Sequence, residues 1–300
     1  MAATLAYYPG CSLKSSSKFY EASIQKIFGR YGITLKEIED WSCCGASAAP
    51  TIDERLGHAL AARNLALAER AESDLFAPCS ACYSRAKVTN EMIRSDATLQ
   101  AEMNRVIEPL EATAAIEVKN IIEVLDDYVG AEVIAKDRKY DLSSLKVVPY
   151  YGCVLTRMMR VKPYDDKENP ESMDRLLFAA GLDVLRWPFK MECCGASKTL
   201  TNKEMTRRLS DRIMDMAITL GADAIVTPCP LCQMNLDLLP ALGRSKESLP
   251  VLFLSEVFDL ALYGKMLGAG SHMIPADKML AKVQAMNRPQ NSFVNARDVQ

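Results

Sequence analysis

The sequence predicts an α/β protein made of two pseudo-symmetric repeats, each a small open parallel sheet flanked by helices. Three observations predict it. The ten cysteines fall into two sets of five, the pentapeptide Cys-Cys-Gly-Ala-Ser occurs at 43–47 and again at 193–197, and each half has one Pro-Cys-x-x-Cys motif. Internal similarity at a fixed period indicates a duplicated unit. Around the cysteines, short apolar runs alternate with helix-like stretches, which is typical of a parallel sheet with crossover helices.

The elements of the first half follow in order from apolar periodicity and from turn residues. We expect a strand at 4–8, a helix at 20–31, a strand at 33–35, a helix after Cys44, a strand at 74–77 and a closing strand–helix pair at 118–129. Leu56, Leu60 and Leu67 form an apolar stripe on the helix after Cys44. A polar link around 135–144 then leads to the second half.

The second half repeats this order. We expect a strand at 147–151, a helix at 173–180, a strand at 182–185, a helix after Cys194 with a stripe of Leu209, Ile213, Met216 and Leu220, a strand at 224–227 and a closing pair at 251–263. The predicted domains are 1–140 and 141–267. Residues 268–300 lie outside the repeat and form a C-terminal arm, packed on the body or on a partner.

The composition excludes several classes of protein. Of the 300 residues 49% are hydrophobic and 25% charged, and the formal net charge is −2, as in ordinary globular proteins. This balance, without a basic run, gives no basis for nucleic-acid binding. No stretch of about 18 apolar residues is present, so we expect no membrane span. The N-terminal residues lack the pattern of a secretory signal, so we expect a cytoplasmic protein.

Ten cysteines beside only two histidines indicate metal or redox chemistry. Disulfides are disfavoured because no export signal is present and because a bridge between adjacent cysteines would be strained. Inert buried thiols do not explain ten cysteines at matched spacing. The strand ends and helix starts at which the cysteines lie predict that the five thiolates of each half converge at the carboxyl edge of its sheet.

Five thiolates per half limit the choice of metal group. Four would fit one zinc ion or one cubane cluster and leave a spare thiol. Adjacent cysteines such as Cys43 and Cys44 cannot easily direct both sulfurs at one tetrahedral ion, but they could reach different irons of an extended cluster. The pattern therefore favours an iron–sulfur cluster of unusual shape in each half, with structural zinc as the alternative.

The repeated order of a lone cysteine, Cys-Cys-Gly and Pro-Cys-x-x-Cys resembles the tandem cysteine-rich CCG domains of the heterodisulfide reductase B subunit. The resemblance covers about residues 4–264 and is close at Tyr-Tyr-Gly-Cys (150–153) and Pro-Cys-Pro-Leu-Cys (228–232). It implies two noncubane [4Fe–4S] clusters with a disulfide substrate cleaved between them, and a complex with a flavin-containing protein of the A type and a ferredoxin-like protein of the C type. The ligands it implies are Cys11, Cys43, Cys44, Cys79 and Cys82 in the first half and Cys153, Cys193, Cys194, Cys229 and Cys232 in the second.

The sequence departs from the methanogenic branch of this family at three positions. Val154 and Gln233 stand where that branch has histidines beside the second cluster, and Gly45 stands where it has proline after the first cysteine pair. A valine side chain cannot donate a proton to a leaving thiolate. We therefore expect a small thiol, disulfide or persulfide substrate other than the coenzyme M–coenzyme B heterodisulfide.

Cations near the cysteines are candidate anchors for an anionic thiol, with solvated surface charge as the alternative for each. They are Lys14 near the first set and Arg157, Arg160, Lys162 and Lys198 near the second; Lys14, Arg157 and Lys198 are the preferred three. His58 is expected to be a packing residue. Trp41 and Trp187 precede the two CCG motifs and are expected to shield the clusters.

Three functions compete on the sequence alone. The first is an oxidoreductase subunit that reduces or forms a disulfide between two clusters, since two facing one-electron centres can deliver an electron pair. The second is an electron-relay subunit that passes electrons to a partner protein or to a quinone without binding a sulfur substrate; the missing membrane span counts against the quinone. The third is a zinc-stabilised scaffold, which the fifth cysteine of each half disfavours.

Overall fold

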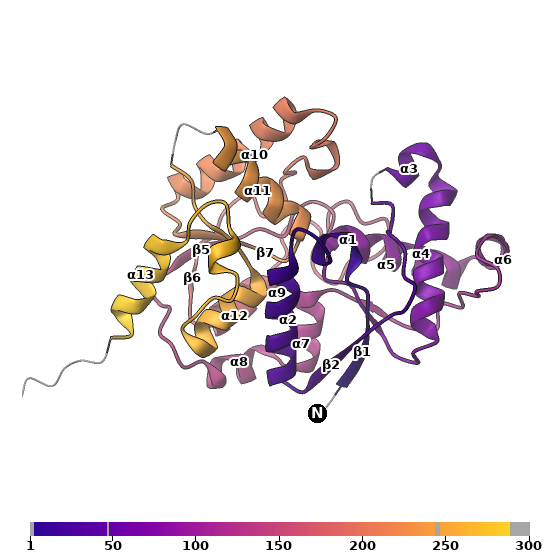
Figure 1. Cartoon of the computed structure of the whole chain (residues 1–300), viewed down its shortest axis with the longest axis horizontal. Coiled ribbons are helices and arrows are strands. Elements are labelled where there is room, and N and C mark those ends of the chain that lie inside the picture. The colour runs from indigo at the N-terminus through magenta and orange to yellow at the C-terminus, as the bar shows by residue number, and fades with distance from the viewer. Residues whose placement is uncertain (1–2, 47, 244–246, 289–300) are drawn as a thin grey trace, which may run out of the picture.

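The computed structural model describes residues 3–46, 48–243 and 247–288. Ser47 of the first Cys-Cys-Gly-Ala-Ser motif and residues 289–300 of the expected C-terminal arm lie outside the described residues. The chain forms an α/β fold with two four-stranded, all-parallel sheets (Figure 1). The predicted fold class, two repeats of a small open parallel sheet with flanking helices, is confirmed.

The two sheets have the same topology. Their strand orders are β2-β1-β3-β4 and β6-β5-β7-β8, and every neighbouring pair is parallel. The strands are β1 (Ala3–Tyr7), β2 (Ile33–Glu37), β3 (Leu75–Phe76) and β4 (Val118–Lys119), then β5 (Lys146–Pro149), β6 (Asp183–Val184), β7 (Ala224–Thr227) and β8 (Val251–Phe253). All four residues of β7 are buried, as expected for an inner strand of a sheet covered on both faces.

Helices connect the strands in both halves. The first half has α1 (Gly10–Leu13), α2 (Lys18–Arg30), α3 (Ala49–Ile52), α4 (Glu54–Glu69), α5 (Ser80–Ser95), α6 (Ala97–Val106), α7 (Ile121–Tyr128) and α8 (Ala131–Asp137). The second half has α9 (Ser172–Ala179), α10 (Lys203–Thr219), α11 (Pro230–Gly243), α12 (Leu254–Tyr263) and α13 (Asp277–Met286). The polar link expected around 135–144 thus begins inside α8.

Helix α13 and the turn before it belong to the expected C-terminal arm, and they pack on the body of the protein. Met279 and Val283 of α13 are buried in the main core. Lys282 pairs with Asp223 at 2.8 Å, and the Asn287 side chain donates to the Asp141 carbonyl at 2.9 Å.

The buried face of α4 differs from the predicted leucine stripe. Leu56 is 41% exposed, and Leu60 and Leu67 are only partly buried. The buried side of α4 consists mostly of small residues, among them Gly57, Ala62 and Ala66, together with Leu65. Small side chains let α4 approach α3 and α5 closely, and apolar periodicity that counts only large residues misses such a face.

The two halves interlock through their closing helices. Helix α12 packs on α2 of the first half, and α7 packs on α9 of the second. Lys26 of α2 pairs with Asp259 of α12 at 2.7 Å, and Arg175 of α9 pairs with Asp126 of α7 at 2.9 Å. In each ion pair, the helix after the first strand of one half binds the closing helix of the other half. The largest hydrophobic core is also continuous across both halves. The repeats are therefore fused into one body.

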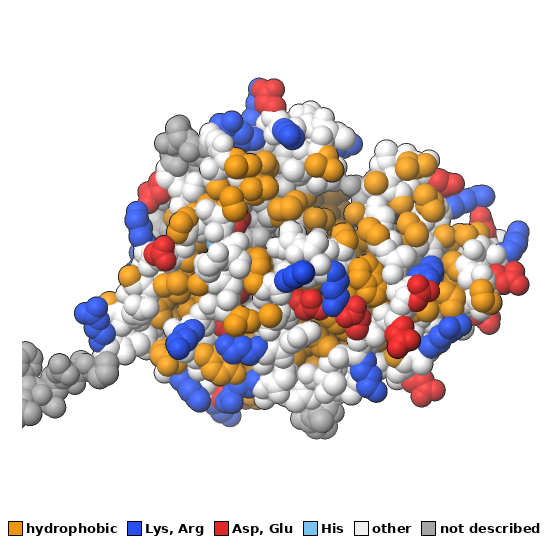
Figure 2. Space-filling model, in the orientation of Figure 1, with side chains coloured by type: hydrophobic (Ala, Val, Ile, Leu, Met, Phe, Trp, Pro, Cys, Tyr) orange, Lys and Arg blue, Asp and Glu red, His pale blue; other side chains and the backbone are white. Residues whose placement is uncertain are grey.

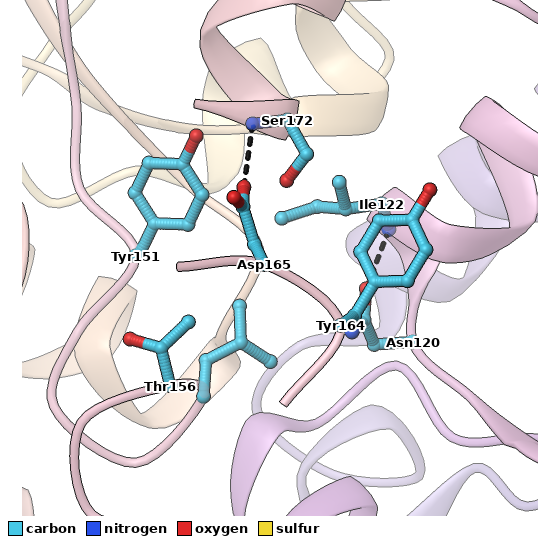
Figure 3. Close-up of a pocket in the computed structure, with 8 residues that line it drawn as sticks. Asn120, Ile122, Tyr151, Thr156, Tyr164, Asp165 and Ser172 are labelled. Atoms are coloured by element: carbon cyan, nitrogen blue, oxygen red, sulfur yellow. Dashed lines mark hydrogen bonds between the residues drawn. The ribbon is translucent and has the colours of Figure 1, made fainter. Parts of the chain in front are cut away.

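A loop between Cys153 and α9 is longer than the corresponding segment of the first half and reaches across to it. Its Arg160 pairs with Glu54 of α4, and its Tyr164 hydroxyl donates to Asp126 of α7 at 2.9 Å. Under the loop lies a cavity of about 10 Å³, space for a single water molecule, lined by residues of both halves (Figure 3).

Candidate metal centre

The cysteines of each half gather where strands end, as predicted. Cys11 and Cys153 follow the central strands β1 and β5, and each Cys-x-x-Cys lies at the start of the helix after β3 or β7. Cys79 is the N-cap of α5, and α11 begins at the residue after Cys229. Backbone N–H groups and the helix dipole favour thiolates at such positions. Six cysteines are buried, Cys153 is partly buried, and three are exposed: Cys11, Cys43 and Cys193.

Within the first set the thiols contact one another. The Cys82 and Cys44 sulfurs are 3.5 Å apart, and the Ala46 N–H donates to the Cys44 sulfur at 3.4 Å. Hydrogen bonds from the Cys43 and Cys82 thiols, with that N–H, lower the pKa of Cys44. A buried sulfur that accepts several hydrogen bonds is held ready to act as a thiolate ligand.

The second set repeats the contact between the cysteine pair and the Cys-x-x-Cys, but here the first cysteine of the pair accepts the backbone hydrogen bond. The Cys194 and Cys232 sulfurs are 3.7 Å apart, and the Gly195 N–H donates to the Cys193 sulfur at 3.3 Å. A hydrogen bond from the Cys153 thiol and the one from Gly195 lower the pKa of Cys193. All ten cysteines are free thiols.

Two glycines let the backbone lie against the Cys-x-x-Cys sulfurs. Gly10 and Gly152 directly precede the lone cysteines and have φ values of +65° and +74°. An added Cβ would lie 2.8 Å from the Cys82 sulfur at Gly10 and 2.9 Å from the Cys232 sulfur at Gly152. Only glycine combines a left-handed backbone with so close an approach to a sulfur atom. Both positions therefore require glycine to leave room for the cysteine thiol.

The two sets meet between the halves. The Cys79 and Cys229 thiols, the first of each Cys-x-x-Cys, interact with each other. Helix α1, which carries Cys11, contacts α11 of the other half. The Tyr20 hydroxyl of α2 donates to the Pro228 carbonyl at 2.8 Å, directly before Cys229. Elements that carry the two cysteine sets therefore contact each other across the boundary between the halves.

Sequence reasoning missed two residues that hold the CCG segments. Arg85, three residues after Cys82, donates to the Ala46 carbonyl at 3.1 Å. Asn235, three residues after Cys232, donates to the Cys194 carbonyl at 3.1 Å. Their equal distance from the second cysteine of each Cys-x-x-Cys was visible in the sequence, but their contacts were not. Arg85 brings a cation to the first set, where the second has a neutral amide.

The donor set fits an iron–sulfur group. Each half offers five free thiols, and soft thiolates select zinc or iron–sulfur clusters. In the described part of the chain, no three His, Cys, Asp or Glu side chains lie close enough together to hold a single metal ion. Five thiols exceed the four ligands of one zinc ion, which favours a larger group.

The comparisons with known proteins agree with this chemistry. Residues 5–86 and 147–237, more than half of the chain, match the family model described as the CCG cysteine-rich domain. The chain is 28% identical to the B subunit of the ferredoxin:CoB–CoM heterodisulfide reductase of Methanosarcina mazei, over 93% of this chain and 96% of that protein. The chain belongs to the family of heterodisulfide reductase B subunits. It is an iron–sulfur oxidoreductase subunit.

Other relatives widen the range of this family. The chain is 33% identical to the 8-methylmenaquinol:fumarate reductase membrane anchor subunit of Wolinella succinogenes, over 91% of this chain and 98% of that protein. A solved structure of a hypothetical protein from Helicobacter pylori shares the fold, with a TM-score of 0.74, 14% identity and 91% of this chain covered. This chain matches 53% of the length of that protein. Among the described helices, none has the length and apolar character needed to cross a bilayer.

The three candidate substrate anchors of this heterodisulfide reductase relative differ in their surroundings. Lys14 pairs with Glu21 and Glu37, each at 2.7 Å. Arg157 pairs with Glu168 at 2.9 Å, on the exposed side of the long loop. Lys198, four residues after Cys194, is exposed and has no ion-pair partner among the described residues. Lys198 is thus the cation with the most freedom to meet an anionic substrate.

Four other residues singled out in the sequence have structural contacts. His58 is buried on α4 and hydrogen-bonds the Thr89 hydroxyl at 2.9 Å. Trp41 and Trp187 each pack edge-on against a tyrosine of the cysteine site. Gln233 is buried and donates to Asp237 at 3.1 Å, within the polar network that holds the segment before α13.

The molecular surface is hollowed between the lobe that carries α10 and α11 and the lobe that carries α3 and α4 (Figure 2). Hydrophobic side chains gather on both sides of the hollow. Beside the CCG segments, Ile52 of α3 is 79% exposed, and Leu200 is 91% exposed. Met158, five residues after Cys153, is 65% exposed. Large apolar side chains with this exposure often mark an interaction surface when they occur together.

Proposed function

We propose that this chain holds two noncubane [4Fe–4S] clusters and that a disulfide is reduced or formed between them, as part of a heterodisulfide reductase-like complex. The proposed ligands are Cys11, Cys43, Cys44, Cys79 and Cys82 for one cluster and Cys153, Cys193, Cys194, Cys229 and Cys232 for the other. The observation that carries this proposal is the repeated set of five free cysteines at the strand ends of both halves, with the Tyr20 hydroxyl of one half bonded to the carbonyl directly before Cys229 of the other.

The residues of the chain have separate tasks in this proposal. When bound, each cluster supplies one electron and an iron that can hold a thiolate product. Gly10 and Gly152 seat the Cys-x-x-Cys sulfurs, and the exposed Cys43 and Cys193 lie on the solvent side, where a substrate enters. Lys198 offers a positive charge to an anionic substrate beside the second set. Reducing a disulfide to two thiolates takes two electrons and no proton, so the proposal needs no acid–base pair from the chain.

The proposed partners follow the family. A flavin-containing protein of the A type and a ferredoxin-like protein of the C type would deliver electrons one at a time, and the complex would be cytoplasmic. A small thiol or disulfide would be the substrate. The acidic pI of about 5.9 and the absence of a basic run support partners other than nucleic acid.

Metal analysis of the anaerobically purified chain tests the cofactor. We expect about eight irons and no stoichiometric zinc per chain, four for each cluster. Cys44→Ser and Cys194→Ser, which replace buried cysteines at equivalent positions, should each leave about half of the iron. About two zincs with little iron, or complete iron loss from either single variant, would contradict one independent cluster per half.

The substrate is proposed to differ from the coenzyme M–coenzyme B heterodisulfide. Val154 provides no proton donor beside Cys153, and the Gln233 amide is already used by Asp237. Turnover assays with reduced dye and a panel of low-molecular-weight disulfides should rank that heterodisulfide well below the best substrate. Comparable rates would refute this part of the proposal.

A second candidate is an electron relay to a quinol or quinone, without a sulfur substrate. Two observations favour it: the 33% identity to the menaquinol:fumarate reductase subunit, and the exposed Ile52, Leu200 and Met158, which follow Cys44, Cys194 and Cys153 closely in the sequence. An apolar rim suits an apolar carrier better than an anionic thiol.

Rapid mixing separates the two candidates. The reduced, cluster-loaded chain is mixed either with a soluble menaquinone analogue or with a disulfide, and cluster oxidation is followed by absorbance. Ile52→Ser combined with Leu200→Ser should slow only the quinone reaction. Phe178→Ser provides a control, because Phe178 is 74% exposed on α9, outside the CCG segments. Oxidation by the disulfide alone would leave the first candidate.

A further inference from the structure

Two buried tyrosines occupy equivalent places in the two cysteine sites. Each follows the central strand of its sheet and lies two residues before the glycine that faces a Cys-x-x-Cys sulfur. The Tyr8 hydroxyl donates to the Ser42 carbonyl at 2.7 Å, and the Tyr150 hydroxyl donates to the Glu192 carbonyl at 2.6 Å. Both carbonyls belong to the residue directly before a cysteine pair. Each tyrosine therefore ties its central strand to its CCG segment.

The same phenols lie beside the thiols. Burial, followed by the charges of Cys82 and Cys44, raises the pKa of Tyr8. Burial, followed by Cys194 and Cys232, raises the pKa of Tyr150. The geometry agrees with this placement: an added Cβ at Gly152 would lie 2.9 Å from the Cys232 sulfur and 3.8 Å from the Tyr150 ring, so the ring and this sulfur flank one glycine.

Neighbouring aromatic rings fix the orientation of both tyrosines. Tyr8 packs edge-on against Trp41 at 5.6 Å between ring centroids, and Tyr150 packs edge-on against Trp187 at 6.3 Å. The indole N–H of Trp187 donates to the Pro149 carbonyl at 2.8 Å. A ring held in this way can position its hydroxyl without rotating away.

We propose that Tyr8 and Tyr150 are positioning residues, each of which holds the adjacent-cysteine ligands of its own half and tunes the cluster bound there. This inference rests on the proposed clusters. Each hydroxyl neutralises the negative end of the carbonyl directly before a ligating cysteine pair, which favours the more negative, reduced state of a cluster and raises its reduction potential. Removing one hydroxyl lowers the potential of one cluster and alters its spectrum, while the other cluster keeps its properties.

The two Tyr-Tyr pairs provide matched controls. Tyr7 and Tyr151 are also buried, and they directly neighbour Tyr8 and Tyr150 in the sequence. Their hydroxyls donate to carboxylates instead, Glu21 at 3.3 Å and Asp174 at 2.7 Å. The variants Tyr8→Phe, Tyr150→Phe, Tyr7→Phe and Tyr151→Phe each remove one buried hydroxyl and keep the ring. Only the first two remove a contact to a CCG segment.

Potentiometric titration of the anaerobic, iron-loaded chain, followed by electron paramagnetic resonance, tests the inference. Cys44→Ser and Cys194→Ser assign each signal to one half. We expect Tyr8→Phe to shift only the first signal and Tyr150→Phe only the second, both to lower potential, with neither control shifted. If a variant loses a cluster, loss of only the signal from the half that carries the substitution also supports the inference.

The outcomes separate this inference from the function on which it rests. A wild-type chain that contains zinc and no cluster signal overturns the proposed function, and this inference with it. Two wild-type cluster signals that keep their potentials in Tyr8→Phe and Tyr150→Phe overturn this inference alone. Equal shifts in the control variants would also overturn it, because they would show a general effect of removing buried hydroxyls.

Discussion

Replacing Gly152 by alanine should remove the cluster of the second half. Gly152 has a φ of +74°, and an added Cβ would lie 2.9 Å from the Cys232 sulfur. A left-handed backbone costs a residue with a Cβ about 1–2 kcal/mol. Favourable contacts between heavy atoms begin near about 3.5 Å, so the sulfur must also move by roughly half an ångström. A displacement of that size takes a cluster ligand out of place.

Gly221→Ala separates the two effects. Gly221 has a φ of +71°, close to that of Gly152, but nothing lies within 4 Å of its added Cβ. This control therefore carries the backbone cost of about 1–2 kcal/mol without the contact to a thiol. Gly10→Ala should act on the first half as Gly152→Ala acts on the second, because its Cβ would lie 2.8 Å from the Cys82 sulfur.

The assay combines iron content with denaturant unfolding of the anaerobic protein. We expect all three variants to unfold at lower denaturant concentration than the wild type. Gly221→Ala should keep all of its iron, whereas Gly152→Ala and Gly10→Ala should each keep about half. Full iron in Gly152→Ala, with a stability equal to that of Gly221→Ala, would refute the reasoning that this glycine seats a ligand.

Three further predictions concern stability and potential. Burial raises the pKa of Glu123 from 4.5 to about 7. The free energy of unfolding of the wild type should therefore fall by up to about 3 kcal/mol as the pH rises through this interval. Urea unfolding of Glu123→Gln between these pH values should show no such dependence on pH. Arg85→Gln should lower the potential of one cluster by tens of millivolts in a redox titration, because a cation near a cluster stabilises its reduced form; an unchanged potential counts against this. Lys26→Met leaves the fully buried Asp259 without its ion pair and should lower the free energy of unfolding by about 3–5 kcal/mol. Arg175, the equivalent cation, is 55% exposed, so Arg175→Met should lower it by less than about 1 kcal/mol. Equal losses in denaturant unfolding would contradict this.

Strands and their connections were predictable because their sequence signals are local. Runs such as Ala-Ile-Val-Thr in β7 end at Pro-Cys, and glycines mark the starts of β2 and β6. The short helix α1 was not predicted, since four residues have no apolar period. The buried face of α4 was misjudged because its alanines carry less periodic signal than Leu56, which is exposed. These errors arise where tertiary packing selects small residues.

The cysteine site was predictable in its members but not in its contacts. The positions of the cysteines after predicted strands placed the thiols at the sheet edges, because parallel strands all end on one side of a sheet. The structural equivalence of Tyr8 and Tyr150 could not be seen in the sequence. Tyr8 is the second residue of its Tyr-Tyr pair, whereas Tyr150 is the first residue of its pair. The carboxylates that bind Lys14 were also hidden, because α2 and β2 supply them from different parts of the chain.

The interlocked helices show how a duplicated chain would hold two centres for the proposed two-electron reaction. If each half closed on itself, a link between the halves would leave the distance between the thiol sets free to vary. Instead α12 packs on α2, and Tyr20 of α2 binds the carbonyl before Cys229, so elements of both halves fix the position of the second Cys-x-x-Cys. The second Cys-x-x-Cys is consequently held in place by an element of the first half. Electron transfer to one substrate from two centres requires such a fixed geometry, and the exchange of closing helices supplies it.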